Sequence, residues 1–179
     1  MIEIKTIGRG GQGAVTFSQI LAIAAFEEGY PVVQAMPSFG VERRGAPSFS
    51  FTRLSKEQCF GNRSLIYAPD MVVVLDPTLM KEMDVTDGLK KNGLLIVNTK
   101  KEVKAKNCKI VTADASSIAL KLFKKDIVNT AMLGAFAAAT ESVSLESLFK
   151  GVEQRFQGDA DLIEKNKQAI KEVYNSLKK

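Results

Sequence analysis

The chain of 179 residues carries a formal net charge of +5, and 45% of its residues are hydrophobic and 25% are charged. This composition is ordinary for one globular domain, so we expect a single domain over residues 1–179. No apolar run approaches the roughly 20 residues that cross a bilayer. The excess positive charge lies in residues 81–126 as scattered lysines without a nucleic-acid motif, which we interpret as solvated faces. We therefore expect a cytoplasmic protein with no membrane and no nucleic-acid partner.

Missing residue types exclude several kinds of active site. Histidine is absent, which removes the commonest general base, the usual zinc ligand and any Ser-His-Asp or Cys-His nucleophile. The two cysteines, Cys59 and Cys108, lie far apart and are too few to hold a four-cysteine iron–sulfur cluster. The sequence therefore predicts no metal site and no catalytic residue of these classes.

The first predicted unit is a strand, a glycine turn and a helix. An apolar run over residues 2–7 leads into glycines that fit G-x-G-x-x-G, the phosphate-binding turn of nucleotide-binding α/β domains. Free N–H groups and the positive end of the following helix favour an anion at such a turn. We name five turn residues as candidate ligand contacts: Gly8, Gly10, Gly11, Gln12 and Gly13. The alternative is a tight turn that binds no ligand.

The helix after this turn is predicted over residues 14–28 and ends at Gly29. Its expected core stripe follows the helical spacing i, i+3, i+4, i+7: Phe17, Ile20, Leu21 and Ala24. The next strand, residues 31–36, has no acidic residue near its end. Because dinucleotide-binding folds hold the ribose hydroxyls with such an acid, its absence argues against ordinary NAD or FAD binding.

Residues 37–47 are predicted to form a loop, because they contain two prolines and two glycines. This loop carries the triplet Glu42, Arg43 and Arg44. The planar guanidinium of arginine suits a carboxylate or a phosphate, so Arg43 and Arg44 join the candidate ligand contacts. A solvated loop in which Glu42 pairs with a neighbouring arginine is the alternative.

The middle of the chain is predicted to form strands with short connections. Phe49 and Phe51 alternate with polar residues, which is typical of a half-buried strand. The continuous apolar run over residues 71–75 indicates a central strand that is buried on both faces. A short helix is expected over residues 78–83. Two further apolar strands follow, over residues 94–98 and 109–113.

The last third of the chain is helical. One helix is predicted over residues 115–123, and Asn129 is expected to cap a second over residues 130–140. This second helix is apolar all round, so either this chain or another subunit must bury it. Ser144 is expected to cap a further helix. Strands that alternate with helices predict an α/β, Rossmann-like three-layer fold with a mostly parallel sheet and a helical C-terminal third.

Four stretches of the chain resemble one protein family. They are residues 8–16, 34–47, 51–53 and 129–135. They resemble the gamma subunit of the 2-oxoacid:ferredoxin oxidoreductases, of the pyruvate or 2-ketoisovalerate type. The block Phe-Gly-Val-Glu-Arg-Arg-Gly-Ala-Pro within the second stretch is far more specific than the glycine turn. The resemblance covers essentially the whole chain.

The resemblance implies a subunit of an enzyme that oxidatively decarboxylates a 2-oxoacid with coenzyme A to acyl-CoA and CO2 while it reduces ferredoxin. It implies alpha, beta and delta-type partner subunits that carry thiamine diphosphate and iron–sulfur clusters, and no cofactor bound by this chain alone. Coenzyme A, a substrate of the complex, would meet the glycine turn and the arginine loop, whose donors suit its phosphates. We expect the isolated chain to be inactive and consider it a candidate homodimer.

Two other functions stay open at this point. The chain is alternatively a free-standing Rossmann-like nucleotide-binding protein, against which the missing acid and the missing histidine weigh. It is alternatively a purely structural interaction module, with which the apolar helix over residues 130–140 and the arginine loop are compatible.

Overall fold

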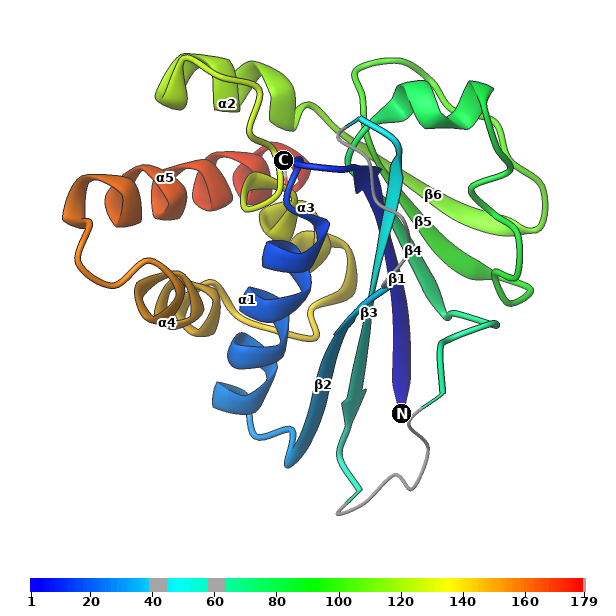
Figure 1. Cartoon of the computed structure of the whole chain (residues 1–179), viewed down its shortest axis with the longest axis horizontal. Helices are drawn as coiled ribbons and strands as arrows, with labels where there is room; N and C mark the ends of the chain where they lie inside the picture. The colour runs from blue at the N-terminus through cyan, green and yellow to red at the C-terminus, as the bar shows by residue number, and fades with distance from the viewer. Residues whose placement is uncertain (39–44, 58–63, 179) are drawn as a thin grey trace.

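The computed structural model describes residues 1–38, 45–57 and 64–178. In these residues the chain forms a six-stranded sheet with helices packed on it (Figure 1). The strands are β1 (Ile2–Arg9), β2 (Val32–Pro37), β3 (Pro47–Ser55), β4 (Met71–Val74), β5 (Gly93–Asn98) and β6 (Cys108–Ala113). The helices are α1 (Ala14–Glu27), the 3-10 helix η1 (Pro77–Lys81), α2 (Ala115–Phe123), α3 (Ala131–Thr140), α4 (Leu145–Arg155) and α5 (Ala160–Leu177).

The sheet has the strand order β2-β3-β1-β4-β5-β6. The strands β1, β4, β5 and β6 pair in parallel, whereas β3 pairs antiparallel with both β1 and β2. The predicted α/β fold with a mostly parallel sheet is therefore confirmed. Val72, Val73 and Val74 of β4 are fully buried, as the continuous apolar run predicted, because strands flank β4 on both sides and both faces are covered.

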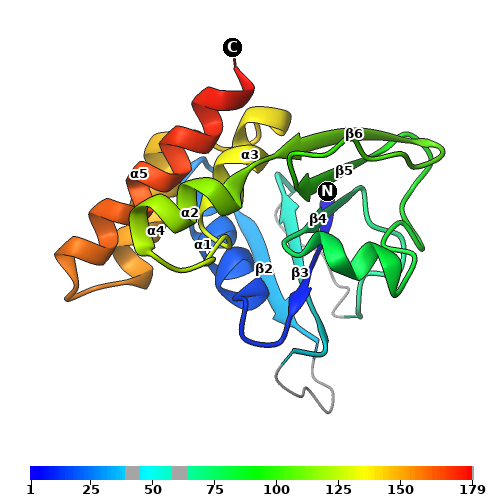
Figure 2. The same cartoon turned by 90° about the horizontal axis from the view of Figure 1, so that it is seen from above.

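The two faces of the sheet are covered very differently, as Figures 1 and 2 show. The α-helices lie on one side, where the larger apolar core includes Phe17, Ile20 and Phe136. The opposite face carries a smaller apolar cluster around Ile7 and Leu79. Within the described ranges, the only helix on this second face is the short η1 (green in Figure 2). The second covering layer is therefore thin and mostly irregular.

The two predicted apolar helices form, and their burial follows the sequence pattern. The core stripe of α1, from Phe17 to Ala24, is fully buried at its four predicted positions, and the chain turns away at Gly29 with φ 83°. Residues 131–137 of α3 are buried as predicted. Helix α5 of the same chain covers α3 so closely that a Cβ on Gly134 would lie 2.1 Å from the carbonyl oxygen of Ile170. No helix in the described ranges is both long enough and apolar enough to cross a bilayer.

One predicted detail is wrong, and two are confirmed. The short helix expected over residues 78–83 forms as the 3-10 helix η1, which begins at Pro77 because the Asp76 carboxylate accepts a hydrogen bond from the Thr78 N–H at 2.9 Å. Asn129 does not cap α3, whose N-cap is Thr130 without any side-chain cap. Ser144 caps α4 as predicted, because its Oγ accepts a hydrogen bond from the Ser147 N–H at 3.1 Å.

Candidate ligand-binding site

The glycine turn lies at the carboxyl end of β1, beside the carboxyl end of β4 (Figure 1). The chain leaves β1 through α1 toward β2 at one edge, and it leaves β4 through η1 toward β5 on the other side. In open α/β sheets, ligands bind in the crevice where neighbouring connections diverge in this way. The fold therefore places the predicted turn at the position where such sheets bind ligands.

Two of the glycines lie in close contact with neighbouring side chains. A Cβ on Gly8 would lie 3.3 Å from Cδ1 of Leu75 and 3.4 Å from Oε1 of Gln12. Gly13 has φ 82°, and a Cβ there would lie 2.2 Å from Nδ2 of Asn129. Helix α3, which follows Asn129, therefore begins directly against the N-terminus of α1. Glycine at position 13 is needed both for the backbone conformation and for this contact.

Gly11 is the exposed tip of the turn. Its φ is 95°, and no heavy atom lies within 4 Å of a Cβ built there. Gly10 is already engaged, because its N–H donates to the Ala46 carbonyl at 2.8 Å and its carbonyl accepts from the Gly45 N–H at 3.2 Å. Gly11 therefore has open space in front of it, whereas Gly10 holds the neighbouring chain segment.

The N-terminus of α1 has no side-chain cap, because its N-cap is Gly13. The first hydrogen bond of the helix runs from the Phe17 N–H to the Gly13 carbonyl at 3.0 Å. The N–H groups of residues 14–16 therefore have no partner inside the helix. Together with the positive end of the helix dipole, they are suited to a phosphate.

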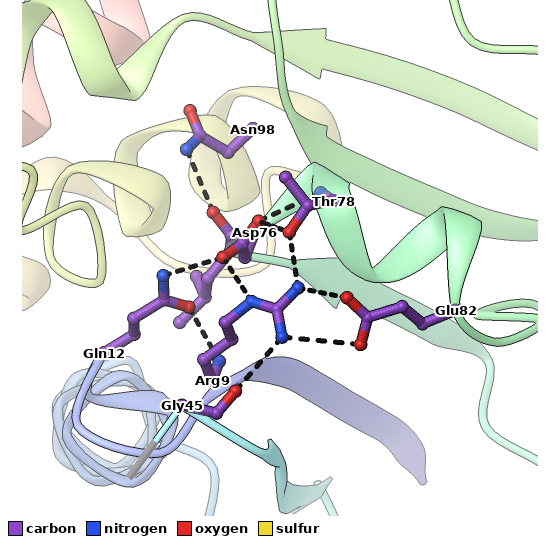
Figure 3. Close-up of polar contacts among 8 residues, drawn as sticks. Arg9, Gln12, Gly45, Asp76, Thr78, Glu82 and Asn98 are labelled. Atoms are coloured by element: carbon purple, nitrogen blue, oxygen red, sulfur yellow. Dashed lines mark hydrogen bonds and ion pairs between the residues drawn. The ribbon is translucent and has the colours of Figure 1, made fainter.

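Asp76 connects the turn to η1 (Figure 3). Its Oδ2 accepts hydrogen bonds from Nε of Arg9 at 3.1 Å and from Nε2 of Gln12 at 3.0 Å. Its Oδ1 accepts from the N–H and the hydroxyl of Thr78 at 2.9 and 2.6 Å. Partial burial opposes the ionisation of Asp76, but the bonds from Thr78 and Gln12 and the Arg9 charge outweigh it and lower the pKa of this carboxyl. Asp76 is therefore a charged anchor for the turn.

Arg9 ties three segments together through its guanidinium (Figure 3). Besides Asp76, it contacts Glu82 through Nη2 and Oε1 at 2.5 Å, and its Nη1 donates to the Gly45 carbonyl at 3.1 Å. Hydrogen bonding to Glu82 is the main cause that raises the pKa of Arg9. With two carboxylates as partners, this guanidinium is neutralised within the protein. Arg9 therefore shapes the turn and is not the cation that a phosphate would meet.

The side chain of Gln12 stabilises the turn through two hydrogen bonds. Its Oε1 accepts a hydrogen bond from the Arg9 N–H at 2.7 Å while its Nε2 donates to Asp76. Both ends of the side-chain amide therefore help to shape the backbone of the turn. The structure gives Gln12 a role in shaping the turn, and the prediction that it contacts a ligand stays a prediction.

Asn98 stabilises the next strand end along the same edge of the sheet (Figure 3). Its Nδ2 donates to the Leu75 carbonyl at 3.0 Å, and its Oδ1 accepts from the N–H groups of Ala115 and Ser116 at 3.1 and 3.2 Å. This buried amide therefore fixes the start of α2 next to the end of β4. Asn98 was not predicted, because its partners are 17 to 23 residues away in the sequence.

The structure brings part of the arginine loop to the turn. Gly45 and Ala46, which follow the Arg-Arg pair, contact Gly10 as described. Arg43 and Arg44 themselves lie outside the described residues, so their role stays a prediction. Arg9, Asp76 and Glu82 were not among the predicted site residues. Arg9 lies within the predicted turn, but its partners Asp76 and Glu82 are 67 and 73 residues away in the sequence.

In this fold the end of the second strand, where the acidic residue is missing, does not lie beside the glycine turn. Strand β2 lies at the edge of the sheet, and β3 separates it from β1. In the dinucleotide-binding order, the second strand lies directly beside the first, so that its terminal acid reaches the ribose. The end of β2 at Pro37 is therefore two strands away from the turn, and the topology itself departs from that mode of NAD or FAD binding.

Known proteins match this chain over nearly its whole length. Residues 3–176 match the family model described as "Pyruvate ferredoxin/flavodoxin oxidoreductase". The chain belongs to this family. A relative from Thermococcus kodakarensis, named pyruvate/ketoisovalerate oxidoreductases common subunit gamma, is 50% identical over 98% of this chain and 96% of its own length. The pyruvate synthase subunit PorC of Methanothermobacter marburgensis is 49% identical over 99% of this chain and 98% of its own length.

The fold is shared with a solved structure of the same family. The crystal structure of pyruvate oxidoreductase subunit PORC from Thermotoga maritima has a TM-score of 0.83 and 39% identity, and the match covers 97% of this chain and 95% of that one. The predicted family and the predicted fold class are therefore confirmed. In both sequence relatives, the chain covers almost the full length of a gamma-type subunit.

Proposed function

We propose that this chain is the gamma-type subunit of a 2-oxoacid:ferredoxin oxidoreductase that acts on pyruvate or a related branched 2-oxoacid. The full-length relationship to gamma and PorC subunits supports this assignment. The complex oxidatively decarboxylates the oxoacid with coenzyme A, forms acyl-CoA and CO2, and reduces ferredoxin. Alpha, beta and delta-type subunits supply thiamine diphosphate and the iron–sulfur clusters.

Within that complex, this chain contributes to the binding of coenzyme A. The observation that carries this part of the proposal is the uncapped N-terminus of α1 behind the exposed Gly11. Coenzyme A is rich in phosphate, and free N–H groups at a positive helix end favour phosphate oxygens. Because Arg9 is paired with Asp76 and Glu82, Arg43 and Arg44 are the cations that we assign to the ligand.

Substitution at Gly11 tests the coenzyme A site. Gly11→Ala has room for its side chain but not a favourable backbone at φ 95°, so the turn must shift and its N–H groups must turn away. We expect the KM for coenzyme A of the assembled enzyme to rise about tenfold or more, since a hydrogen bond to a charged group contributes about 1.5–3 kcal/mol. The KM for the oxoacid should stay unchanged.

Gly158→Ala is the matched control. Gly158 has φ 93° and equally open surroundings, but it lies between α4 and α5. Its substitution imposes a similar backbone strain without touching the turn. An unchanged KM for coenzyme A in Gly11→Ala, or an equal change in both variants, would remove the glycine turn from the coenzyme A site.

Purification of the native complex tests the subunit assignment itself. We expect anaerobic co-purification to recover this chain in fixed ratio with thiamine-binding and ferredoxin-like chains. Oxoacid-dependent dye reduction should require those chains and should be absent from this chain alone. Recovery of this chain alone, with micromolar NADH or FAD binding, would instead favour the free-standing nucleotide-binding protein.

A further inference from the structure

The thinly covered face of the sheet contains a large groove. Residues 80–89, which begin at the end of η1, and residues 104–108, which lead into β6, line a groove with a volume of about 790 Å³. Met80, Met83 and Leu89 form its apolar lining and pack, partly buried, against the smaller apolar cluster. Methionine side chains adapt to the shape of a partner and are frequent at protein interfaces. The groove therefore has the lining of a docking surface.

Positive charge is concentrated along one wall of this groove. Residues 99–109 contain five lysines and one glutamate, which amounts to nearly all of the net charge of +5. Of these five lysines, Lys100 alone forms an ion pair with any described residue, to Asp114 at 3.2 Å. Lys104 and Lys106 line the groove and are exposed. Two of the five lysines of this segment thus lie directly on the groove.

The acidic residues of the groove cancel only part of this charge. Glu82 is paired with Arg9, which it shares with Asp76. The Asp84 carboxylate accepts hydrogen bonds from the Thr86 N–H and hydroxyl at 2.8 and 2.6 Å and keeps its negative charge, so three lysines face two carboxylates in the groove. Lys81 on the opposite wall adds a further exposed cation. The field in the groove therefore favours an anionic occupant, and such a field both speeds and orients association.

The residues that line the groove favour some classes of binding partner over others. Single-stranded nucleic acid would be expected to stack on aromatic side chains, and none of the lining residues is aromatic. A second copy of this chain would bring two surfaces of a molecule with net charge +5 together. An acidic protein segment with a protruding apolar side chain satisfies both the lysine rim and the methionine-lined floor.

We infer that this groove docks an acidic segment of a partner subunit in the assembled oxidoreductase. An apolar side chain of the partner lies against Met80 and Met83, and its carboxylates pair with Lys104 and Lys106. This inference rests on the proposed function only in that it requires a heteromeric enzyme. The glycine turn is not part of the docking surface, although Glu82 borders both through its bond to Arg9.

Lysine footprinting of the purified complex tests the inference directly. The complex and the free chain are treated with N-hydroxysuccinimidyl acetate, and the acetylation rate of each lysine is measured by mass spectrometry. We expect Lys104 and Lys106 to react about tenfold more slowly in the complex, because their ammonium groups become paired. Lys171, which is exposed on α5 on the other side of the sheet, should react equally in both. Equal rates for Lys104 and Lys106 in both samples would overturn the inference.

Two further controls separate the alternative occupants. Protection of Lys104 in the free chain that grows with its concentration would identify a second copy as the occupant and overturn the inference. Protection of Lys104 in the free chain by coenzyme A alone would identify a small anionic ligand and overturn it as well. Failure to recover any complex would instead overturn the proposed function itself, so the two failures are distinguishable.

Reversing the charge of two groove lysines measures how much they contribute to the affinity of assembly. The double variant Lys104→Glu/Lys106→Glu should weaken assembly about tenfold or more, and raised salt should weaken the wild type more than the variant. The control Lys125→Glu/Lys171→Glu changes the net charge equally at two exposed lysines that are outside the groove and have no ion pair among the described residues. Equal weakening by both variants would reduce the effect to overall charge and contradict a specific surface.

Discussion

The N-termini of α1 and α4 differ in how they are closed, although the two helices pack against each other. At α4, Ser144 caps the helix, and the Glu28 carboxylate accepts hydrogen bonds from the Ser144 N–H at 2.7 Å and the Ser147 hydroxyl at 2.6 Å. At α1, Gly13 offers no side chain, and the first N–H groups stay free of a helical partner. The fold therefore closes the N-terminus of α4 with side chains and leaves the N-terminus of α1, at the carboxyl edge of the sheet, without a side-chain cap.

The largest expected effect comes from adding a side chain at the open end. Gly13→Ala places a Cβ at φ 82° and 2.2 Å from the Asn129 amide, so we expect a loss of about 2–4 kcal/mol in the free energy of unfolding. Urea unfolding of the purified chain measures this loss. Gly158→Ala, with similar φ and no clash, should lose only about 1–2 kcal/mol. Equal losses would show that the contact with Asn129 is unimportant.

The next effect comes from the anchor of the turn. Asp76→Asn removes the charge that Arg9, Gln12 and Thr78 share, so we expect a loss of about 2 kcal/mol. Hydrogen exchange at the backbone of residues 8–13 should accelerate. Asp114→Asn at the capped N-terminus of α2 is the control, because it should lower stability without changing exchange in the glycine turn. Unchanged exchange in Asp76→Asn would contradict the anchoring role.

The same carboxyl predicts a dependence on pH. Because the pKa of Asp76 is lowered in the folded chain, its contribution to stability is complete above about pH 4, the ordinary aspartate pKa. That contribution is lost as the pH falls through the lowered pKa. The difference in unfolding free energy between wild type and Asp76→Asn should therefore shrink below pH 4. A difference that stays constant down to acid pH would show that the charge of Asp76 contributes nothing.

A substitution at the capped N-terminus of α4 should lower stability less than the substitutions at the glycine turn. Ser144→Ala removes one side-chain cap, and we expect a loss of about 1 kcal/mol, as for other serine N-caps. Thermal unfolding of the purified chain measures the loss. Ser142→Ala, just outside α4, is the control and should be nearly neutral. A neutral Ser144→Ala would show that Glu28 alone closes this helix end.

The smallest effect concerns Glu28. Hydrogen bonds from Ser144 and Ser147 lower the pKa of this carboxyl, so its stabilising contribution is present at neutral pH and is lost on acidification. Wild type and Glu28→Gln should therefore differ slightly at pH 7 and converge at acid pH. Chemical unfolding at a series of pH values measures this convergence. Curves that diverge in acid would contradict the assigned sign.

Local patterns predicted much of the fold. The strand, glycine turn and helix at the start of the chain, the buried run at β4 and the apolar α3 all form as expected, since each is specified by neighbouring residues. The Asn129 cap was wrong for a tertiary reason. The side chain lies against Gly13, 116 residues away, and its Oδ1 has no hydrogen-bond partner in the described part of the chain.

The family, the elements and the position of the glycine turn were predictable without a structure, because periodicity, glycine spacing and a specific loop motif are readable along the chain. The folded chain alone reveals that β3 lies between β1 and β2, and that Arg9 meets Asp76 and Glu82 instead of a ligand. It also places Lys81, Lys104 and Lys106 along one groove. Strand order and charge pairing depend on residues that are distant in sequence, and their partners become neighbours only when the sheet and its two covering layers assemble.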